Sequence, residues 1–199
     1  MKYKKILVIF FFALIFTFII YKHCINNKIN ILFLGDNYII NKDYKTYDDY
    51  LFESLSNSND LGSFNNNFVY ETKNYSDIIN DINNNIYISF KGENIYLNQL
   101  IGKSDFIVIS ANNDNYIDKC YKDKYILDNY NTILINKINL LVNLISKISN
   151  AKIYIIGNYC NNINNNLTLK DDNIKYIELK NNYENINYYI FKTIINDIN

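Results

Sequence analysis

The stretch INILFLGDNYII, Ile29–Ile40, decides how this domain is built. Its first half is an almost continuous apolar run, which is typical of a strand buried on both faces of a parallel sheet. The run breaks at Gly35 and continues into Asp36 and Asn37. In open α/β sheets, ligand-binding and catalytic residues follow the carboxyl ends of the strands. The stretch therefore predicts a parallel α/β domain whose site begins at Gly35.

Further apolar runs alternate with amphipathic segments along the rest of the chain. We expect strands at 30–34, 67–71, 105–111, 151–157 and 174–179. Helices are expected at 47–56, at 76–84 with Ser76 as the N-cap, and at 96–103, 127–149 and 184–197. This order predicts a three-layer α/β/α domain around a five-stranded parallel sheet. In a flavodoxin-like strand order, strands 30–34 and 105–111 would be neighbours.

The N-terminus predicts a location for the protein. The basic flank MKYKK precedes the uncharged run ILVIFFFALIFTFIIY, residues 6–21. As a helix this run is roughly 24 Å long, slightly short of the ~30 Å hydrocarbon core of a bilayer. No small-x-small cleavage site follows it. We expect a single-pass transmembrane helix in 1–22 that stays uncleaved, a hinge in 23–29, and a domain in 30–199 on the extracytoplasmic side of the membrane.

Composition and charge restrict the partners. The chain has 20 basic and 20 acidic residues, so its formal net charge of zero offers no electrostatic argument for binding nucleic acid. Asn, Ile, Lys and Tyr are abundant, whereas Pro and Trp are absent. These preferences follow AT-rich codons, so we give them no functional meaning. The membrane, through the N-terminal helix, is the partner that the sequence predicts.

A second polar cluster, ANND at Ala111–Asp114, follows the expected strand 105–111. The SGNH or GDSL-type hydrolases have conserved sequence blocks that are numbered along the chain. LFLGDN, Leu32–Asn37, resembles the first block of that family, and DFIVISANND, Asp105–Asp114, resembles the third. That family contains esterases, lipases and carbohydrate O-deacetylases. The resemblance covers most of residues 30–199 and includes the order of strands and helices.

The resemblance assigns a role to each matching position and exposes the departures. Gly35 and Asp36 match the first block, but Asn37 stands where the family has its nucleophilic Ser. Asn113 and Asp114 match the third block, in which the Asn donates to the oxyanion hole, while Ala111 replaces a Gly. No Gly lies between residues 64 and 90 to supply the second block. The terminal Asp-x-x-His is missing from LKNNYENINYY, residues 179–189.

These departures predict a degraded active site. Acyl transfer needs a nucleophile and an adjacent base, and loss of either can cost about a millionfold in rate. Asn37 has no hydroxyl, and the chain's one histidine, His23, precedes the domain. We therefore expect a non-catalytic domain that binds a surface glycan or an acylated ligand without a cofactor. The binding residues would be Gly35, Asp36, Asn37, Ala111, Asn113 and Asp114.

Two rival interpretations stay open. An active esterase or O-deacetylase would need another nucleophile, such as Ser110 in a dyad with Lys103 or Lys152. A structural surface protein would not use the crevice that the two polar clusters, after strands 30–34 and 105–111, are expected to share. Aromatic residues near the expected carboxyl-end loops suit a glycan, although core packing or codon bias explains any single one more often than not. They are Tyr38, Tyr44, Tyr47, Tyr116 and Tyr159.

Neither the cysteines nor the carboxylates predict a metal site. Cys24, Cys120 and Cys160 do not have the spacing of metal ligands. Cys120 and Cys160 each follow an expected strand, so a disulfide between them and a pair of separate thiols are both open. Asp36 and Asp114 alone offer few oxygen ligands for a divalent cation.

Overall fold

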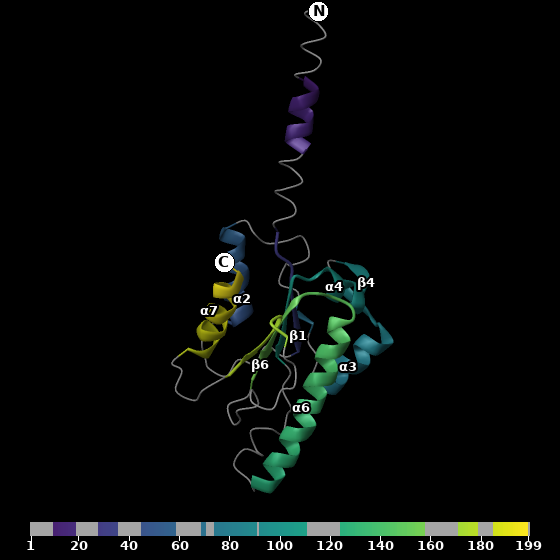
Figure 1. Cartoon of the computed structure of the whole chain (residues 1–199), viewed down its shortest axis with the longest axis vertical. Coiled ribbons are helices and arrows are strands. Elements are labelled where there is room, and N and C mark those ends of the chain that lie inside the picture. Colours follow the sequence, from purple (N-terminus) through teal and green to yellow (C-terminus); the bar gives the residue numbers. More distant parts are fainter. Residues whose placement is uncertain are drawn as a thin grey trace, which may run out of the picture.

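The structure is a computed structural model that describes residues 10–18, 28–35, 45–58, 69–70, 74–90, 92–110, 124–157, 171–178 and 185–198. Its centre is a parallel sheet (Figure 1). In spatial order the strands are β2 (Val69–Tyr70), β1 (Ile31–Gly35), β5 (Phe106–Ser110), β6 (Lys152–Ile156) and β7 (Ile174–Ile177). The helices are α2 (Tyr47–Asn57), α3 (Tyr75–Asn84), α4 (Leu97–Lys103), α6 (Lys124–Ser146) and α7 (Ile186–Ile198).

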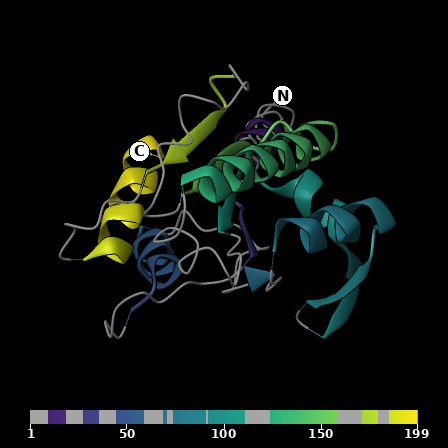
Figure 2. The same ribbon diagram turned by 90° about the horizontal axis from the view of Figure 1, so that it is seen from below.

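Helices cover both faces of the sheet because the strand side chains alternate between two cores. In β1, Leu32 and Leu34 join a core built with α3, α4 and α6, whereas Ile31 and Phe33 join a core built with α2 and α7. Burial on both faces is what makes the strand sequence continuously apolar. Figure 2 shows the two helical layers on either side of the strands. The predicted α/β class is confirmed, and the arrangement is compatible with three layers.

The longest helix, α6, packs through a stripe of apolar residues. Leu134, Ile138, Leu141 and Ile145 of α6 are all buried, and Ile148 packs against the same core just beyond the helix end. Their spacing of four and three residues keeps them on one side of a 3.6-residue helix. That stripe holds α6 against the sheet beside α3.

The number of strands differs from the prediction. An antiparallel hairpin of β3 (Tyr87–Phe90) and β4 (Glu93–Tyr96) stands apart from the main sheet, between α3 and α4. Gly92 turns this hairpin with a φ of +80°, a conformation that residues with a Cβ rarely adopt. Tyr96, expected as the first residue of a helix, ends β4 and is the N-cap of α4.

The helix starts show where local signals decide and where they do not. Thr46 caps α2 through a reciprocal capping box with Asp49, and the acidic residues Asp48 and Asp49 lie in the first turn of the helix. The prediction of Ser76 as the cap of α3 is wrong. Asn74 takes that place, and its side-chain oxygen accepts a hydrogen bond of 3.0 Å from the Asp77 N–H. Asn and Ser cap equally well, so the sequence alone could not separate the two positions.

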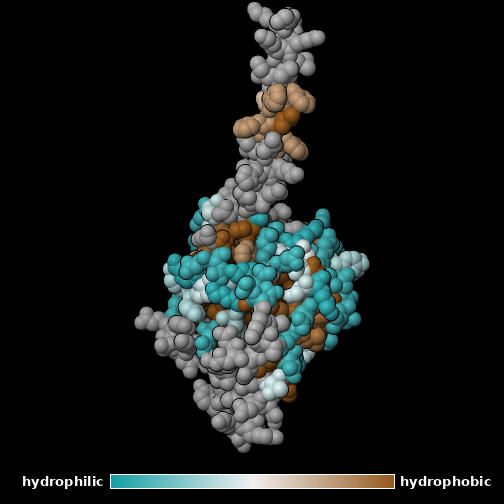
Figure 3. All heavy atoms as spheres, in the orientation of Figure 1, coloured by the Kyte–Doolittle hydropathy of each residue, from teal (hydrophilic) through white to brown (hydrophobic). Residues whose placement is uncertain are grey.

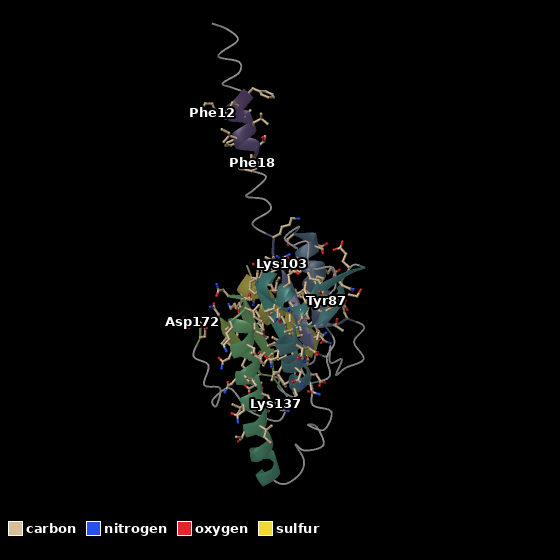
Figure 4. All side chains as sticks on the ribbon, turned by 90° about the vertical axis from the view of Figure 1, so that its right-hand side faces the viewer. Phe12, Phe18, Tyr87, Lys103, Lys137 and Asp172 are labelled. Atoms are coloured by element: carbon tan, nitrogen blue, oxygen red, sulfur yellow. The ribbon has the colours of Figure 1, made fainter. Side chains whose placement is uncertain are left out.

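Most of the predicted anchor, 1–22, lies outside the described residues. Residues 10–18 are helical, and Phe12 and Phe18 expose most of their side-chain surface (Figure 4). Figure 3 colours these residues as hydrophobic. Within the ranges that the structure describes, no helix has the length and apolar character that crossing a membrane requires.

Candidate functional site at the carboxyl edge of the sheet

The register of β1 and β5 brings together the strand ends that carry the two predicted motifs. These strands are parallel neighbours, and Gly35 is the register partner of Ser110. Asp36 follows Gly35 in the chain, and Ala111 follows Ser110. Both motifs therefore follow adjacent strands at the end of the sheet where the carboxyl ends of the strands lie, which we call the carboxyl edge. This end carries the sites of open α/β folds.

Of the six predicted binding residues, Gly35 is the one that the structure describes. The others, Asp36, Asn37, Ala111, Asn113 and Asp114, lie outside the described residues, as do Cys24, Cys120 and Cys160. Gly35 has a φ of +108° at the very end of β1. A side chain there would strain the backbone, because this region of φ is accessible almost only to glycine. The backbone thus requires this Gly whether or not the site catalyses anything.

A buried pair of hydroxyls lies beneath this edge. Ser110 ends β5 with a buried side chain, and strand alternation directs it to the same side of the sheet as Val108, towards α2. There it shares a hydrogen bond with the hydroxyl of Tyr47, the first residue of α2. The Tyr47 ring lies 5.8 Å from the Phe33 ring, centroid to centroid. The Tyr47–Ser110 pair ties the start of α2 to the end of β5.

The electrostatics of this pair do not activate Ser110. Burial raises the pKa of Tyr47 well above its usual value, the charge of neighbouring Asp48 raises it further, and the hydrogen bond from Ser110 lowers it only in part. Tyr47 therefore stays neutral and cannot serve as a base at neutral pH. A serine without an adjacent base is a weak nucleophile. Sequence reasoning missed this pairing because nothing in the spacing of residues 47 and 110 signals it.

The structure also excludes the dyad of Ser110 with either lysine. Lys152 pairs with Phe106 at the amino end of β5, four residues before Ser110. Four residues of strand span about 13 Å, far beyond hydrogen-bond reach. Lys103 ends α4 before β5 begins, so it too lies towards the amino edge. A dyad of Ser110 with Lys103 or with Lys152 is therefore ruled out.

An aromatic cluster covers the α2 and α7 side of the carboxyl edge. The Tyr50 ring of α2 lies 5.7 Å from Tyr188 and 5.6 Å from Phe191, both on α7. Both helices begin at this edge, since Tyr47 of α2 reaches Ser110 and α7 follows β7. Tyr188 keeps 43% of its surface exposed. By contrast, Tyr47, which the sequence offered as an exposed aromatic, is buried; the other tyrosines named with it lie outside the described residues.

A polar hollow of about 450 Å³ opens at the opposite edge. Asp105, Lys152 and Asp197 contribute to its lining. Asp197 at the end of α7 accepts a hydrogen bond of 2.9 Å from Lys175 and one of 3.2 Å from the Tyr154 hydroxyl, and its carboxylate lies 3.4 Å from Lys152. These contacts fasten the last helix to β6 and β7. We assign no binding role to the hollow, since it lies at the amino ends of the strands.

The described residues contain no group of three or more His, Cys, Asp or Glu side chains that could hold a metal ion. Neither a scan against protein-family models nor a search of curated proteins finds a match for this chain.

Proposed function

We propose that this chain is a membrane-anchored extracytoplasmic protein whose domain has the SGNH-hydrolase fold without its catalytic residues. In this proposal it binds a surface glycan at the carboxyl edge of the sheet. The strand order β2-β1-β5-β6-β7 supports the fold, because it matches the flavodoxin-like order 2-1-3-4-5 when the sheet strands are counted along the chain.

One observation carries the proposal: Gly35 and Ser110 are register partners. The blocks that resemble the family's first and third motifs are attached to these two residues, so they share one edge, as a common crevice requires. The ends of these two strands are neighbours in any sheet with this strand order, and in this chain the residues that follow them are the ones that resemble the two motifs. The proposed crevice extends from the ends of β1 and β5.

The loss of catalysis is supported by what stands at each chemical position. Asn37 occupies the nucleophile position and lacks a hydroxyl, and no His occurs after residue 23. Ser110, which directly precedes Ala111, is bonded to a neutral Tyr47 and is far from Lys152. Among the described residues, neither the neutral Tyr47 nor the distant Lys152 is placed to accept a proton from Ser110.

The aromatic cluster favours a glycan over an acyl chain. Tyr188 presents an apolar ring together with a polar hydroxyl, a combination that suits a sugar, which also has apolar faces and hydroxyl groups. Lys45 and Lys192 lie over the rings of Tyr50 and Tyr188, at 4.9 and 5.4 Å from the centroids, so the surroundings of this rim are polar and charged. An acyl chain would be better served by an enclosed apolar pocket.

The first test is for hydrolysis. The full chain in detergent micelles, beside its Asn37→Ser and Ser110→Ala variants, is assayed with a short-chain aryl ester. We expect no hydrolysis above background from any of them, because restoring a Ser without a His supplies no base. Hydrolysis by the native chain that disappears in Ser110→Ala would establish an enzyme and overturn the proposal.

The second test is for binding to an array of immobilised oligosaccharides. Tyr188→Ala should weaken binding about tenfold, equivalent to ~1.4 kcal/mol. Tyr87→Ala is the matched control, because Tyr87 is an exposed tyrosine on the distant β3–β4 hairpin. Equal binding by the native chain and both variants would rule out the aromatic rim as the glycan site.

A further inference from the structure

One face of the β3–β4 hairpin points away from the hydrophobic core. Ile88 and Ile95 pack from its inner face against the core shared by α3, α4 and α6. On the outer face, Tyr87 and Tyr96 are register partners, and they keep 59% and 38% of their surface exposed. Two exposed aromatic rings in contact form a continuous surface, and such exposed surfaces can mark a site of interaction with a partner or a membrane.

The two tyrosines act as a single amphipathic unit. Their rings lie 3.8 Å apart, centroid to centroid, and their hydroxyls are hydrogen-bonded to each other. The result is an apolar surface with a polar tip, carried on a short, closed hairpin. Side chains with this division between an apolar body and a polar end are enriched where membranes meet water.

The position of the hairpin links it to the proposed anchor. The hairpin leads directly into α4, a helix about 10 Å long. The residues that follow α4 lie beside the start of β1. There the Asp105 N–H donates to the Asn30 carbonyl at 2.8 Å, and the Asn30 N–H donates to the Asp105 carboxylate at 2.7 Å. Figure 4 shows Tyr87 and Lys103 in the same half of the domain, with Lys137 of α6 in the other half.

The length of the hinge keeps this half of the domain near the bilayer. The hinge, 23–29, separates the proposed anchor from β1, and so short a segment spans at most about 25 Å when fully extended. If residues 1–22 anchor the chain, the start of β1 at the amino edge of the sheet lies within about 25 Å of the end of the anchor. The carboxyl edge is displaced from the amino edge by the length of a strand, about 17 Å.

We propose that Tyr87 and Tyr96 rest in the headgroup region of the membrane that anchors the chain, so that the hairpin forms a second point of membrane contact. Two contacts hold the domain with the carboxyl edge facing away from the bilayer. A ligand is then bound from the aqueous side. This inference rests on the anchor of the proposed function, and its test separates the two.

The absence of Trp from the chain provides the measurement. A Tyr87→Trp variant of the full chain carries a single Trp, and Tyr96→Trp provides the same probe at the second position. Ile133→Trp is the matched control, because Ile133 is 54% exposed on α6, in the helix half that leads away from the amino edge. Each variant is incorporated into vesicles of equal parts phosphatidylcholine and phosphatidylglycerol, with and without lipid brominated near the headgroup.

We expect both hairpin probes to shift their emission to shorter wavelength in vesicles and to lose intensity with brominated lipid, while the Ile133→Trp probe does neither. Chains that fail to float with the vesicles would overturn the anchor, and this proposal with it. Chains that float with unquenched hairpin probes would overturn the hairpin contact and leave the anchor in place. Equal quenching of hairpin and control probes would refute the proposed orientation.

Discussion

Removing the hydroxyl of Tyr47 tests the buried Tyr47–Ser110 hydrogen bond beneath the carboxyl edge of the sheet. Tyr47→Phe keeps the ring against Phe33 and removes only the oxygen that is bonded to Ser110. A net hydrogen bond is worth about 1 kcal/mol, and a buried hydroxyl left without its partner costs roughly 1–3 kcal/mol. We therefore expect Tyr47→Phe to lower the free energy of unfolding by about 1.5 kcal/mol.

The partner variant makes the experiment quantitative. Ser110→Ala should cost a similar amount, whereas the double variant should cost less than the sum by about 1 kcal/mol, because no orphaned hydroxyl remains. Urea unfolding of the full chain in detergent micelles, followed by near-ultraviolet circular dichroism, measures all four species. Tyr188→Phe is the control, and the exposure of Tyr188 limits its expected change to about 0.5 kcal/mol.

Additive losses would refute this reasoning. If the losses of the two single variants sum to the loss of the double variant within about 0.3 kcal/mol, the hydroxyls are not coupled, and Ser110 would be available for another role.

The pH dependence of stability is a second readout of the same pair. A raised pKa of Tyr47 contributes stability that is complete below the usual tyrosine value of 10.0 and is lost as the pH rises towards the folded-state pKa. Above pH 10.0, and below the folded-state pKa of Tyr47, the native chain should lose stability more steeply than Tyr47→Phe, by about 1.4 kcal/mol per pH unit.

Three further substitutions test the scaffold, each by urea unfolding of the full chain. Gly35→Ala forces a Cβ into a backbone with a φ of +108° and should cost about 1–3 kcal/mol; an unchanged midpoint would contradict the strain. Ile145→Ala empties part of the α6 stripe and should cost about 3 kcal/mol, with a loss below 1 kcal/mol inconsistent with its burial. Burial alone would raise the pKa of Asp197, but hydrogen bonds and charge from Lys175 and Lys152 outweigh it and hold the pKa below the usual 3.8. Asp197→Asn should therefore cost about 1 kcal/mol at neutral pH, and the difference should disappear as the native chain is acidified through that lowered pKa; a difference that persists in acid would point to lost packing.

Local patterns predicted most elements because each depends on neighbouring residues. The apolar run of 30–34 and the stripe at Leu134 and Ile138 are readable in the sequence, since burial on two faces or on one helical side produces a fixed spacing. The hairpin carried a weaker signal. Alternation around Ile88 and Ile95, with Gly92 between them, would have identified it, but strands this short compete poorly with a helical interpretation.

For the candidate site too, some features follow from the sequence and others only from the tertiary structure. The sequence by itself determined that Asn37 has no hydroxyl, that no His follows residue 23, and that strands and helices alternate, because these are matters of residue identity and local spacing. Only the tertiary structure decided that Gly35 is paired with Ser110, that the Ser110 hydroxyl is bonded to Tyr47, and that Lys152 lies at the opposite edge. Those relations depend on the register between strands that lie far apart in the chain, and the packing of the whole core sets that register.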